Sequence, residues 1–328
     1  MPDRPRVSII TPSYNQAAFL EQTILSVLRQ DYPDLEYIVV DGASDDGSVE
    51  IIRKYADRIA WWVSEPDQGQ GDAINKGFLR ATGEIVAWLN SDDVYLRGAV
   101  SSAVDKLMAD PACGLVYGDV LSLGESDKPI HIQEFGQYDL SDLMKFQIIG
   151  QPAVFMRRSV LMETGFLDNN FRFLLDHHLW LRIAGQTRIC YSGELWAAAR
   201  YHAAAKNLAQ AGKFGSEAFE LVEWMKESPE LARLYQQNEK KIVGGAAWLN
   251  AYYLSVSGAP RQALGVYWQS FRNDPGRVLK DWKRVLFTLG SLLGLERFGK
   301  KLQYRKQRAI AQAYQHYLEF IKSTSGEI

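Results

Sequence analysis

Short apolar runs alternate with helical segments over the first 90 residues, and this alternation limits the fold more than any other feature of the chain. The runs 7–10, 35–40, 59–63 and 84–89 have the length and apolar content of buried strands. Between them, helical periodicity is clearest over 19–28, and further helices are expected up to residue 55 and over 72–80. Helical connections between consecutive strands are typical of parallel sheets. The pattern therefore predicts an α/β fold with a doubly wound, mostly parallel sheet.

Polar residues concentrate in the loops that leave these strands, at 11–15, 41–48, 64–71 and 90–93. In open α/β sheets such loops meet at one edge, where ligands bind. No GxGxxG motif follows the first strand, and GxxxxGK[ST] occurs nowhere in the chain. A nucleotide bound at this edge would therefore need another source of positive charge for its phosphates.

Two adjacent carboxylates, Asp92 and Asp93, follow the fourth apolar run. Hard divalent cations prefer carboxylate oxygens together with substrate phosphates. We therefore predict that a Mg²⁺ or Mn²⁺ ion binds here as a cofactor. The alternative is an acid pair that caps a helix beginning near Gly98.

Composition narrows the class of protein. The 328 residues carry a formal net charge of -2, which gives no indication of a nucleic-acid partner. The only two cysteines, Cys113 and Cys190, lie far apart in the sequence, which argues against a disulfide scaffold and suits a reducing compartment. The polar residues 1–6 leave no room for a secretory signal, and no apolar run reaches the roughly 18 residues of a membrane span. We expect a cytoplasmic protein.

Four sequence blocks together resemble the family 2 glycosyltransferases. They are VSIITPSYNQAAFLEQTILSVLRQ, EYIVVDGASDDGSVEIIRKY, SEPDQGQGDAINKGFLRATGEIVAWLNSDD and FRFLLDHHLWLRIA. The resemblance implies a catalytic domain of the GT-A fold over residues 1–210. It also implies an inverting enzyme, of hexosyltransferase type, that moves a sugar from a nucleotide diphosphate sugar to an acceptor hydroxyl.

The resemblance places the nucleotide against the first two loops. It implies that Thr11 contacts the nucleotide through its backbone and that Tyr14 packs on the base, although Tyr14 is alternatively a turn residue at the sheet edge. Asp41 would bind the base or the ribose. Many relatives have a second acid at the next position, where this chain has Gly42, so the identity of the base stays open.

Further donor contacts are expected from the polar segment SEPDQGQGDAINKG. Asp67 would contact the nucleoside, Asn75 lies in the same nucleotide-sugar site, and Lys76 would reach a phosphate or a sugar hydroxyl. A solvated helix position is the alternative for Lys76. In this arrangement Asp93 is the direct metal ligand, and Asp92 contacts the ribose or metal-bound water.

A glycosyl transfer also needs a base, since an acceptor hydroxyl is a poor nucleophile until its proton is removed. The segment LDHHLWLR resembles the family's acidic motif, which identifies Asp176 as that base. Relatives often have acids where this chain has Leu175 and His178. His177 either touches the acceptor or is only a histidine at the start of a helix.

The apolar run 115–120 predicts a further strand, at the start of the acceptor half. The segment 151–156 resembles a strand of the family that faces the acceptor channel. Asp119 and Gln151 are expected to contact the acceptor there. The alternative for each is a polar cap at the edge of the sheet.

A basic cluster follows the catalytic segment. Arg200 and Lys206 resemble residues that close over the diphosphate, where they would stabilise the departing negative charge. His202 would complete the metal shell. His177, His178 and His202 together do not predict a zinc site. One adjacent histidine pair and scattered cysteines lack the spacing of four zinc ligands.

From about residue 210 the pattern is helical, which predicts a helical region over 211–328. Within it, 246–275 resembles one degenerate helix-turn-helix unit of the tetratricopeptide type, which must pack on other elements. Residues 272–308 contain eleven Lys or Arg and three acids beside apolar residues. We expect this basic amphipathic segment to contact the inner face of an anionic membrane. The alternative is a helical bundle with a solvated basic face.

The leading hypothesis is a metal-dependent inverting glycosyltransferase of polysaccharide, lipopolysaccharide or related glycoconjugate synthesis, with a glycan or lipid-linked acceptor. A nucleotidyltransferase would favour a glycine-rich loop with a basic residue after the first strand, and TPSYN has neither. The other alternative is an inactive relative that only binds nucleotide sugar. The presence of Asp92, Asp93 and Asp176 together argues against it.

Overall fold

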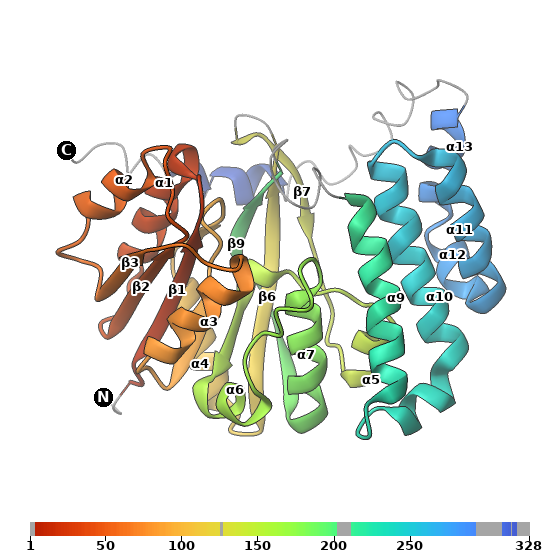
Figure 1. Ribbon diagram of the computed structural model, residues 1–328, viewed down its shortest axis with the longest axis horizontal. Coiled ribbons are helices and arrows are strands. Elements are labelled where there is room, and N and C mark those ends of the chain that lie inside the picture. The colour runs from red at the N-terminus through yellow and green to blue at the C-terminus, as the bar shows by residue number, and fades with distance from the viewer. Residues whose placement is uncertain (1–3, 125–126, 202–210, 293–309, 316, 320–328) are drawn as a thin grey trace.

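A computed structural model describes residues 4–124, 127–201, 211–292, 310–315 and 317–319. Its nine-stranded curled sheet fills the left and centre of Figure 1, and a group of helices stands beside the sheet on the right. The strands are β1 (Val7–Ser13), β2 (Leu35–Asp41), β3 (Trp61–Ser64), β4 (Ile85–Trp88), β5 (Val94–Tyr95), β6 (Cys113–Leu123), β7 (Pro129–Gln133), β8 (Val154–Arg157) and β9 (Arg188–Arg200).

The helices fall into two groups along the chain. Those interspersed with the strands are α1 (Ala17–Leu28), α2 (Ser48–Lys54), α3 (Gln70–Arg80), α4 (Ala99–Ala109), α5 (Leu140–Met144), α6 (Arg158–Thr164) and α7 (Leu175–Gln186). Those of the helical region are α9 (Ala211–Glu227), α10 (Ala232–Val256), α11 (Pro260–Asn273), α12 (Pro275–Lys280) and α13 (Trp282–Leu292).

The strand order is β3-β2-β1-β4-β8-β6-β9-β5, with β7 paired to β6. As the β-α alternation predicts, β3, β2, β1 and β4 run parallel, and α1, α2 and α3 supply the connections. In the second half, β8 runs antiparallel to both β4 and β6, while β6 and β9 are parallel. The predicted α/β class is confirmed, and the antiparallel strands make the sheet mixed.

The strand directions bring several polar loops to one edge. Since β8 is antiparallel to β4 and to β6, and β6 is parallel to β9, strands β4 and β9 point the same way. The carboxyl ends of β1, β2, β4 and β9 therefore lie at the same edge. Helix α7 ends just before β9 begins, so its first turn also lies toward this edge.

The largest hydrophobic core is shared by the sheet and the helical region. Trp88 of β4 stacks on Trp180 of α7 with ring centroids 5.2 Å apart, and both side chains are buried. The same cluster continues into α9 and α10 through Phe214, Leu221 and Leu249. Helices α9 and α10 therefore share a core with the sheet and α7, and the division into domains at 210/211 stays a prediction.

The described residues from 211 onward form helices and turns, as predicted. α10 and α11 form the helix pair expected over 246–275, and the turn between them contains Gly258 with φ +80°. That left-handed backbone favours glycine. Within the described ranges, none of the helices combines the length and hydrophobicity needed to span a membrane.

Two sequence expectations need correction. The segment 151–156 is a strand only from Val154, where β8 begins. A 3₁₀ turn, η2 (Gln151–Ala153), precedes it, and Pro152 has no N–H to donate to a strand ladder. Cys113 and Cys190 form a disulfide between the neighbouring strands β6 and β9, with Cα atoms 6.1 Å apart. Their separation of 77 residues in sequence gives no sign that the two strands are adjacent.

Candidate active site

Asp92 and Asp93 lie in the loop between β4 and β5, at the carboxyl edge of the sheet. Asp93 is only 5% exposed. Its Oδ1 accepts a hydrogen bond of 3.1 Å from the backbone N–H of Arg200, and Asn90 Nδ2 lies 3.4 Å from its Oδ2. Burial, and then the charge of Asp92, raises the pKa of Asp93 well above the ordinary value. We call residues 90–93 the acid loop.

The acid loop fits a divalent cation. A bound cation relieves the cost of ionising a buried carboxylate beside a second acid. Across the described ranges, no group of three or more His, Cys, Asp or Glu side chains is arranged to hold a metal. One or two carboxylates are nevertheless sufficient for Mg²⁺ when substrate phosphates complete the shell. His202, the predicted third ligand, and Lys206 lie outside the described residues.

Asn90 connects the acid loop to its neighbours. Its Nδ2 donates to Gln151 Oε1 at 3.0 Å, and its Oδ1 accepts from Gln70 Nε2 at 2.7 Å. Gln151 in turn donates to the carbonyl of Trp88 at 2.8 Å. Gln151 therefore supports the acid loop. The predicted contact of Gln151 with an acceptor stays a prediction. Sequence reasoning missed Asn90 and Gln70, although both lie inside the blocks that carry the family resemblance.

Arg200, at the end of β9, is buried and holds the acid loop from the other side. It donates to the carbonyl of Asp92 at 2.9 Å and to the carboxylate of Asp127 at 2.7 and 3.2 Å. It also bonds Gln22 of α1 and, at 3.1 Å, the hydroxyl of Tyr317. The guanidinium is therefore engaged with protein groups, and its predicted contact with the diphosphate stays a prediction.

Tyr14, Gly42 and Asp67 lie together beside the ends of the first strands. Tyr14 is 63% exposed. A Cβ atom at position 42 would lie 2.7 Å from Asp67 Oδ2 and 3.3 Å from Tyr14 Cδ2. A larger residue would therefore displace the Asp67 carboxylate, which gives a physical reason for glycine at this position. The structure thus brings together Tyr14 and Asp67, two residues of the predicted nucleoside site, with Gly42 between them and the sheet edge left without a side chain.

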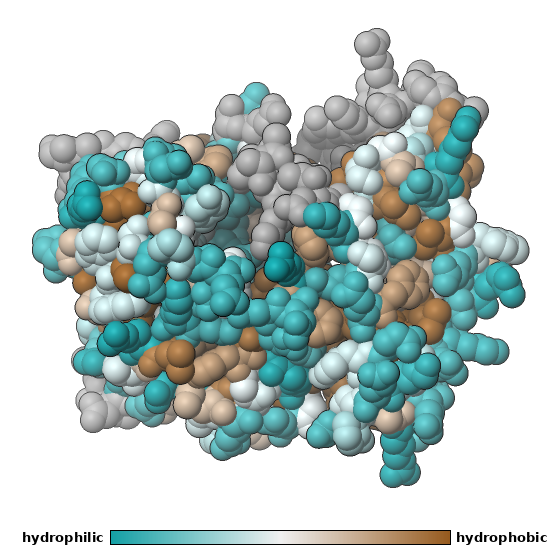
Figure 2. All heavy atoms as spheres, viewed as in Figure 1, coloured by the Kyte–Doolittle hydropathy of each residue, from teal (hydrophilic) through white to brown (hydrophobic). Residues whose placement is uncertain are grey.

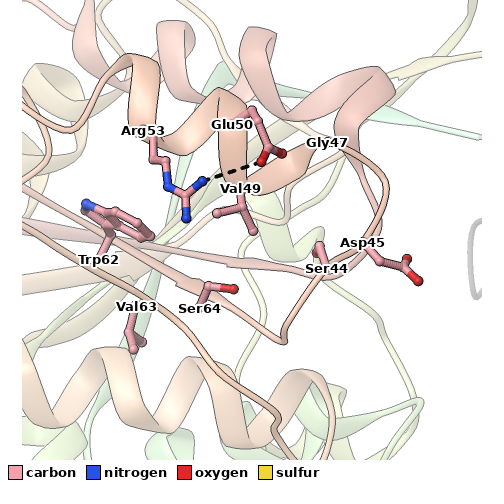
Figure 3. A pocket seen from close by; sticks show the side chains of 9 residues that line it. All are labelled: Ser44, Asp45, Gly47, Val49, Glu50, Arg53, Trp62, Val63 and Ser64. Carbon is pink, nitrogen blue, oxygen red and sulfur yellow. Dashed lines mark hydrogen bonds and ion pairs between the residues drawn. The ribbon is translucent and has the colours of Figure 1, made fainter.

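Asp41 and Thr11 are buried and fix the shape of the loops. Asp41 accepts hydrogen bonds from the N–H and hydroxyl of Ser44 at 2.9 and 2.6 Å, and from the hydroxyl of Ser64 at 2.7 Å. Thr11 Oγ1 accepts from the Tyr37 hydroxyl at 3.0 Å. Ser44 and Ser64 also line an open hollow of about 640 Å³ between α2 and β3, shown in Figure 3.

Asn75 and Lys76, neighbours on α3, have different surroundings. The Asn75 side chain donates to the carbonyl of Leu167 at 2.8 Å and accepts from its N–H at 3.0 Å, so it ties α3 to the loop before α7. Lys76 pairs with Glu65 at 3.0 Å and with Asp72 at 3.5 Å. The hydrogen bond to Glu65 is the main cause of a raised pKa for Lys76.

Asp176 lies in the first turn of α7, where its Oδ1 accepts the N–H of His177 at 2.7 Å. The His177 ring itself is 1% exposed and has its Nε2 3.0 Å from the carbonyl of Leu143. Burial lowers the pKa of His177 to about 4. The structure therefore favours a core histidine over a contact with the acceptor.

Asp119, the other predicted acceptor contact, is 8% exposed. Its Oδ1 accepts the N–H of Phe135 at 3.0 Å and the hydroxyl of Tyr191 at 2.8 Å. These bonds hold the segment after β7 against β6 and β9. The geometry favours the alternative of a polar cap for Asp119.

Tyr201 and Tyr253 have pKa values above the ordinary value of tyrosine. Burial, followed by the charges of Tyr252 and Asp93, raises the pKa of Tyr201 to about 12. Burial also raises the pKa of Tyr253, with contributions from Tyr252, Tyr201 and Asp176.

Solved structures identify the fold. A mannosyltransferase from Pyrobaculum calidifontis in complex with GDP-Man and Mn²⁺ has a TM-score of 0.57 at 22% identity, over 90% of this chain and 88% of that one. Residues 1–349 of TarS from S. aureus, in complex with UDP-GlcNAc, have a TM-score of 0.56 at 17% identity, over 94% and 91%. The chain has the GT-A fold of these glycosyltransferases.

Sequence comparison then gives the family. The family model described as glycosyl transferase family 2 matches residues 8–165 of this chain. A putative teichuronic acid biosynthesis glycosyltransferase, TuaG of Bacillus subtilis, is 34% identical over 188 residues, which are 55% of this chain and 72% of that relative. The chain belongs to glycosyltransferase family 2. The family match ends before Asp176 and the helical region.

Proposed function

We propose that the chain is a metal-dependent inverting glycosyltransferase that uses a nucleotide diphosphate sugar. One observation carries the proposal: an acid pair in the β4–β5 loop, of which Asp93 is buried, and a third acid at the start of α7 both lie toward one edge of the sheet. The Mn²⁺ and GDP-Man in the Pyrobaculum enzyme and the UDP-GlcNAc in TarS support this class of cofactor and donor.

The two acidic sites have different tasks in this proposal. Asp93 binds the cation directly, and Asp92 supports it from the side of the ribose. A bound cation would neutralise the diphosphate as negative charge grows on the leaving group. Tyr14 and Asp67 contact the nucleoside.

Asp176 removes the proton of the acceptor hydroxyl while its oxygen attacks the anomeric carbon. The attack comes from the face opposite the leaving nucleoside diphosphate, so the configuration of that carbon inverts. The name of the Bacillus relative supports a glycan or lipid-linked acceptor in polysaccharide synthesis.

Turnover of a donor panel tests the proposed function. UDP- and GDP-sugars, including UDP-GlcNAc and GDP-mannose, are incubated with the protein in Mn²⁺, Mg²⁺ or EDTA, and released nucleoside diphosphate is measured. We expect turnover of one donor class, loss of that turnover in EDTA and recovery with added metal. Binding without turnover of any donor would instead support an inactive relative, and release of pyrophosphate from nucleoside triphosphates would support a nucleotidyltransferase.

We also propose that α12 and α13 contact an anionic membrane surface from the cytoplasmic side. Of the predicted segment 272–308, the structure describes 272–292. Its exposed face carries apolar side chains beside Lys280 and Lys283: Leu279, Trp282, Leu286, Phe287, Leu289 and Leu292. Figure 2 shows apolar surface among hydrophilic residues over the helices on the right. Exposed apolar side chains flanked by lysines are typical of helices that lie in a membrane interface.

Replacing Trp282, Leu286 and Leu289 together by glutamine is expected to weaken membrane binding at least tenfold, because each buried apolar side chain contributes roughly 1 kcal/mol or more. The measurement is flotation with vesicles of phosphatidylglycerol and phosphatidylcholine. Leu79→Gln is the matched control, since Leu79 is 67% exposed on α3, away from the segment. Equal flotation of the triple variant and the wild type would refute membrane contact through this face.

A further inference from the structure

Glu217 of α9 is a buried carboxylate that reaches from the helical region into the loop before α7. It is 5% exposed. Its Oε1 accepts the backbone N–H of Arg172 at 2.6 Å, and its Oε2 accepts those of Phe173, at 2.7 Å, and Leu174. Three consecutive backbone donors thus converge on one side chain that lies more than 40 residues later in the chain.

The position of these donors matters for Asp176. The first N–H groups of a helix have no partner within the helix and are usually capped by a nearby side chain. Leu174 is the N-cap of α7, and its apolar side chain provides no such hydrogen bond. Glu217 instead accepts from the N-cap residue and the two residues before it, so it holds the chain that leads into α7. Hydrogen bonds to a charged group are the stronger kind. Asp176 follows only two residues after the last of the three donors.

Apolar and cation–π contacts reinforce the same attachment. Phe214, one turn before Glu217 on α9, packs on Phe173 with ring centroids 5.1 Å apart. The ammonium of Lys213 lies 6.0 Å from the centre of the Phe173 ring. On its other side, Phe214 stacks on Tyr253 of α10 at 4.4 Å. Helix α9 therefore holds the backbone and the side chains of the loop that leads into α7.

We propose that Glu217 is a positioning residue for the catalytic base. It fixes the backbone of 172–174, so that the first turn of α7 presents the Asp176 carboxylate to the acceptor hydroxyl. This inference rests on the proposed role of Asp176 and adds to it a task for the helical region. A displacement of about 1 Å at a reacting group can lower a rate about a hundredfold.

Three variants of α9 test the proposal. Glu217→Ala removes all three acceptor contacts, Glu217→Gln keeps the size and one acceptor oxygen, and the control Glu220→Ala changes an exposed glutamate on the same helix. Turnover of UDP-GlcNAc and GDP-mannose in Mn²⁺ gives kcat and KM, and calorimetry gives the affinity for UDP and GDP. Hydrogen exchange reports the amides of 172–174.

We expect Glu217→Ala to lower kcat at least about thirtyfold while the nucleotide affinity stays within about twofold. Exchange at 172–174 should become faster in this variant. Glu217→Gln should recover part of kcat, and Glu220→Ala should behave as the wild type. A purely structural role of Glu217 would not separate kcat from nucleotide affinity in this way.

Two results would overturn the proposal. One is a folded Glu217→Ala with the kcat of the wild type; the other is a parallel loss of kcat and nucleotide affinity, which would indicate a general packing role. If Glu217→Ala does not fold, Glu217→Gln decides by the same criteria. Asp176→Asn in the same assay separates the hypothesis that Asp176 is the base from the hypothesis that Glu217 fixes the loop. Wild-type turnover in Asp176→Asn would remove the assignment of the base. Faster hydrogen exchange at 172–174 in Glu217→Gln would still show that Glu217 holds this segment.

Discussion

Replacing Asp93 by asparagine is expected to lower metal-dependent donor turnover at least about a thousandfold, because a cation that stabilises the leaving group contributes several kcal/mol. Asparagine has the size of aspartate and can still accept the N–H of Arg200 through its oxygen. It lacks the charge needed to bind the cation. The measurement is nucleoside diphosphate release against Mn²⁺ concentration, with the exposed Asp57→Asn as the control.

The same substitution should leave the metal-free protein at least as stable as the wild type. The pKa of Asp93 is raised in the folded state, so the folded protein holds this proton more tightly than the unfolded chain. Stability of the metal-free wild type should therefore fall as the pH rises above the ordinary carboxyl range, and Asp93→Asn should lack this contribution. Thermal unfolding measured as a function of pH tests whether the stability of the wild type falls as the pH rises. Unchanged metal-dependent turnover in Asp93→Asn would contradict the metal assignment.

The first half of the fold was predictable because its information is local. Each of β1 to β4 is a short apolar run, and the connections between them are amphipathic helices, so the order of elements alone indicates a parallel sheet. The position of β8 is different. It pairs with β4 and β6 in antiparallel directions across long sequence separations, and nothing in its own residues specifies those partners.

Contacts of the site residues with partners far away in sequence were also not predictable. The chemistry of Asp92, Asp93 and Asp176 follows from residue type and motif, and the structure brings them toward one sheet edge. Arg200 and Asn75 have residue types that suit a donor site, yet their structural partners are Asp127 and Leu167, 73 and 92 residues away in sequence. Periodicity and motif spacing carry no information about such contacts.

Both acidic sites depend on residues from the last third of the chain. Glu217 bonds the turn that precedes Asp176, and the Tyr317 hydroxyl donates to Asp127 at 2.6 Å while it contacts Arg200, which holds the carbonyl of Asp92. The helical residues after 210 are thus coupled to the shape of the site. A sequence match that ends at residue 165 does not include either contact.

Asp176→Asn is expected to lower transfer at least about a thousandfold while the affinity for UDP or GDP with Mn²⁺ stays unchanged. A positioned general base typically contributes a factor of about 10² to 10⁴, and the amide has no basic oxygen. The structure offers no substitute from the adjacent histidine, since His177 is buried against Leu143 and its pKa is lowered to about 4. The loss should therefore approach the upper part of that range.

Two measurements separate this result from misfolding. Asparagine Oδ1 can keep the hydrogen bond from the His177 N–H, so thermal unfolding of Asp176→Asn should match the wild type. Glu163→Gln, an exposed change on the neighbouring α6, is the control for turnover. If Asp176→Asn transfers sugar at the wild-type rate, the base is another residue. If it loses nucleotide affinity together with turnover, Asp176 belongs to the donor site, and the division of tasks between the acid loop and α7 is wrong.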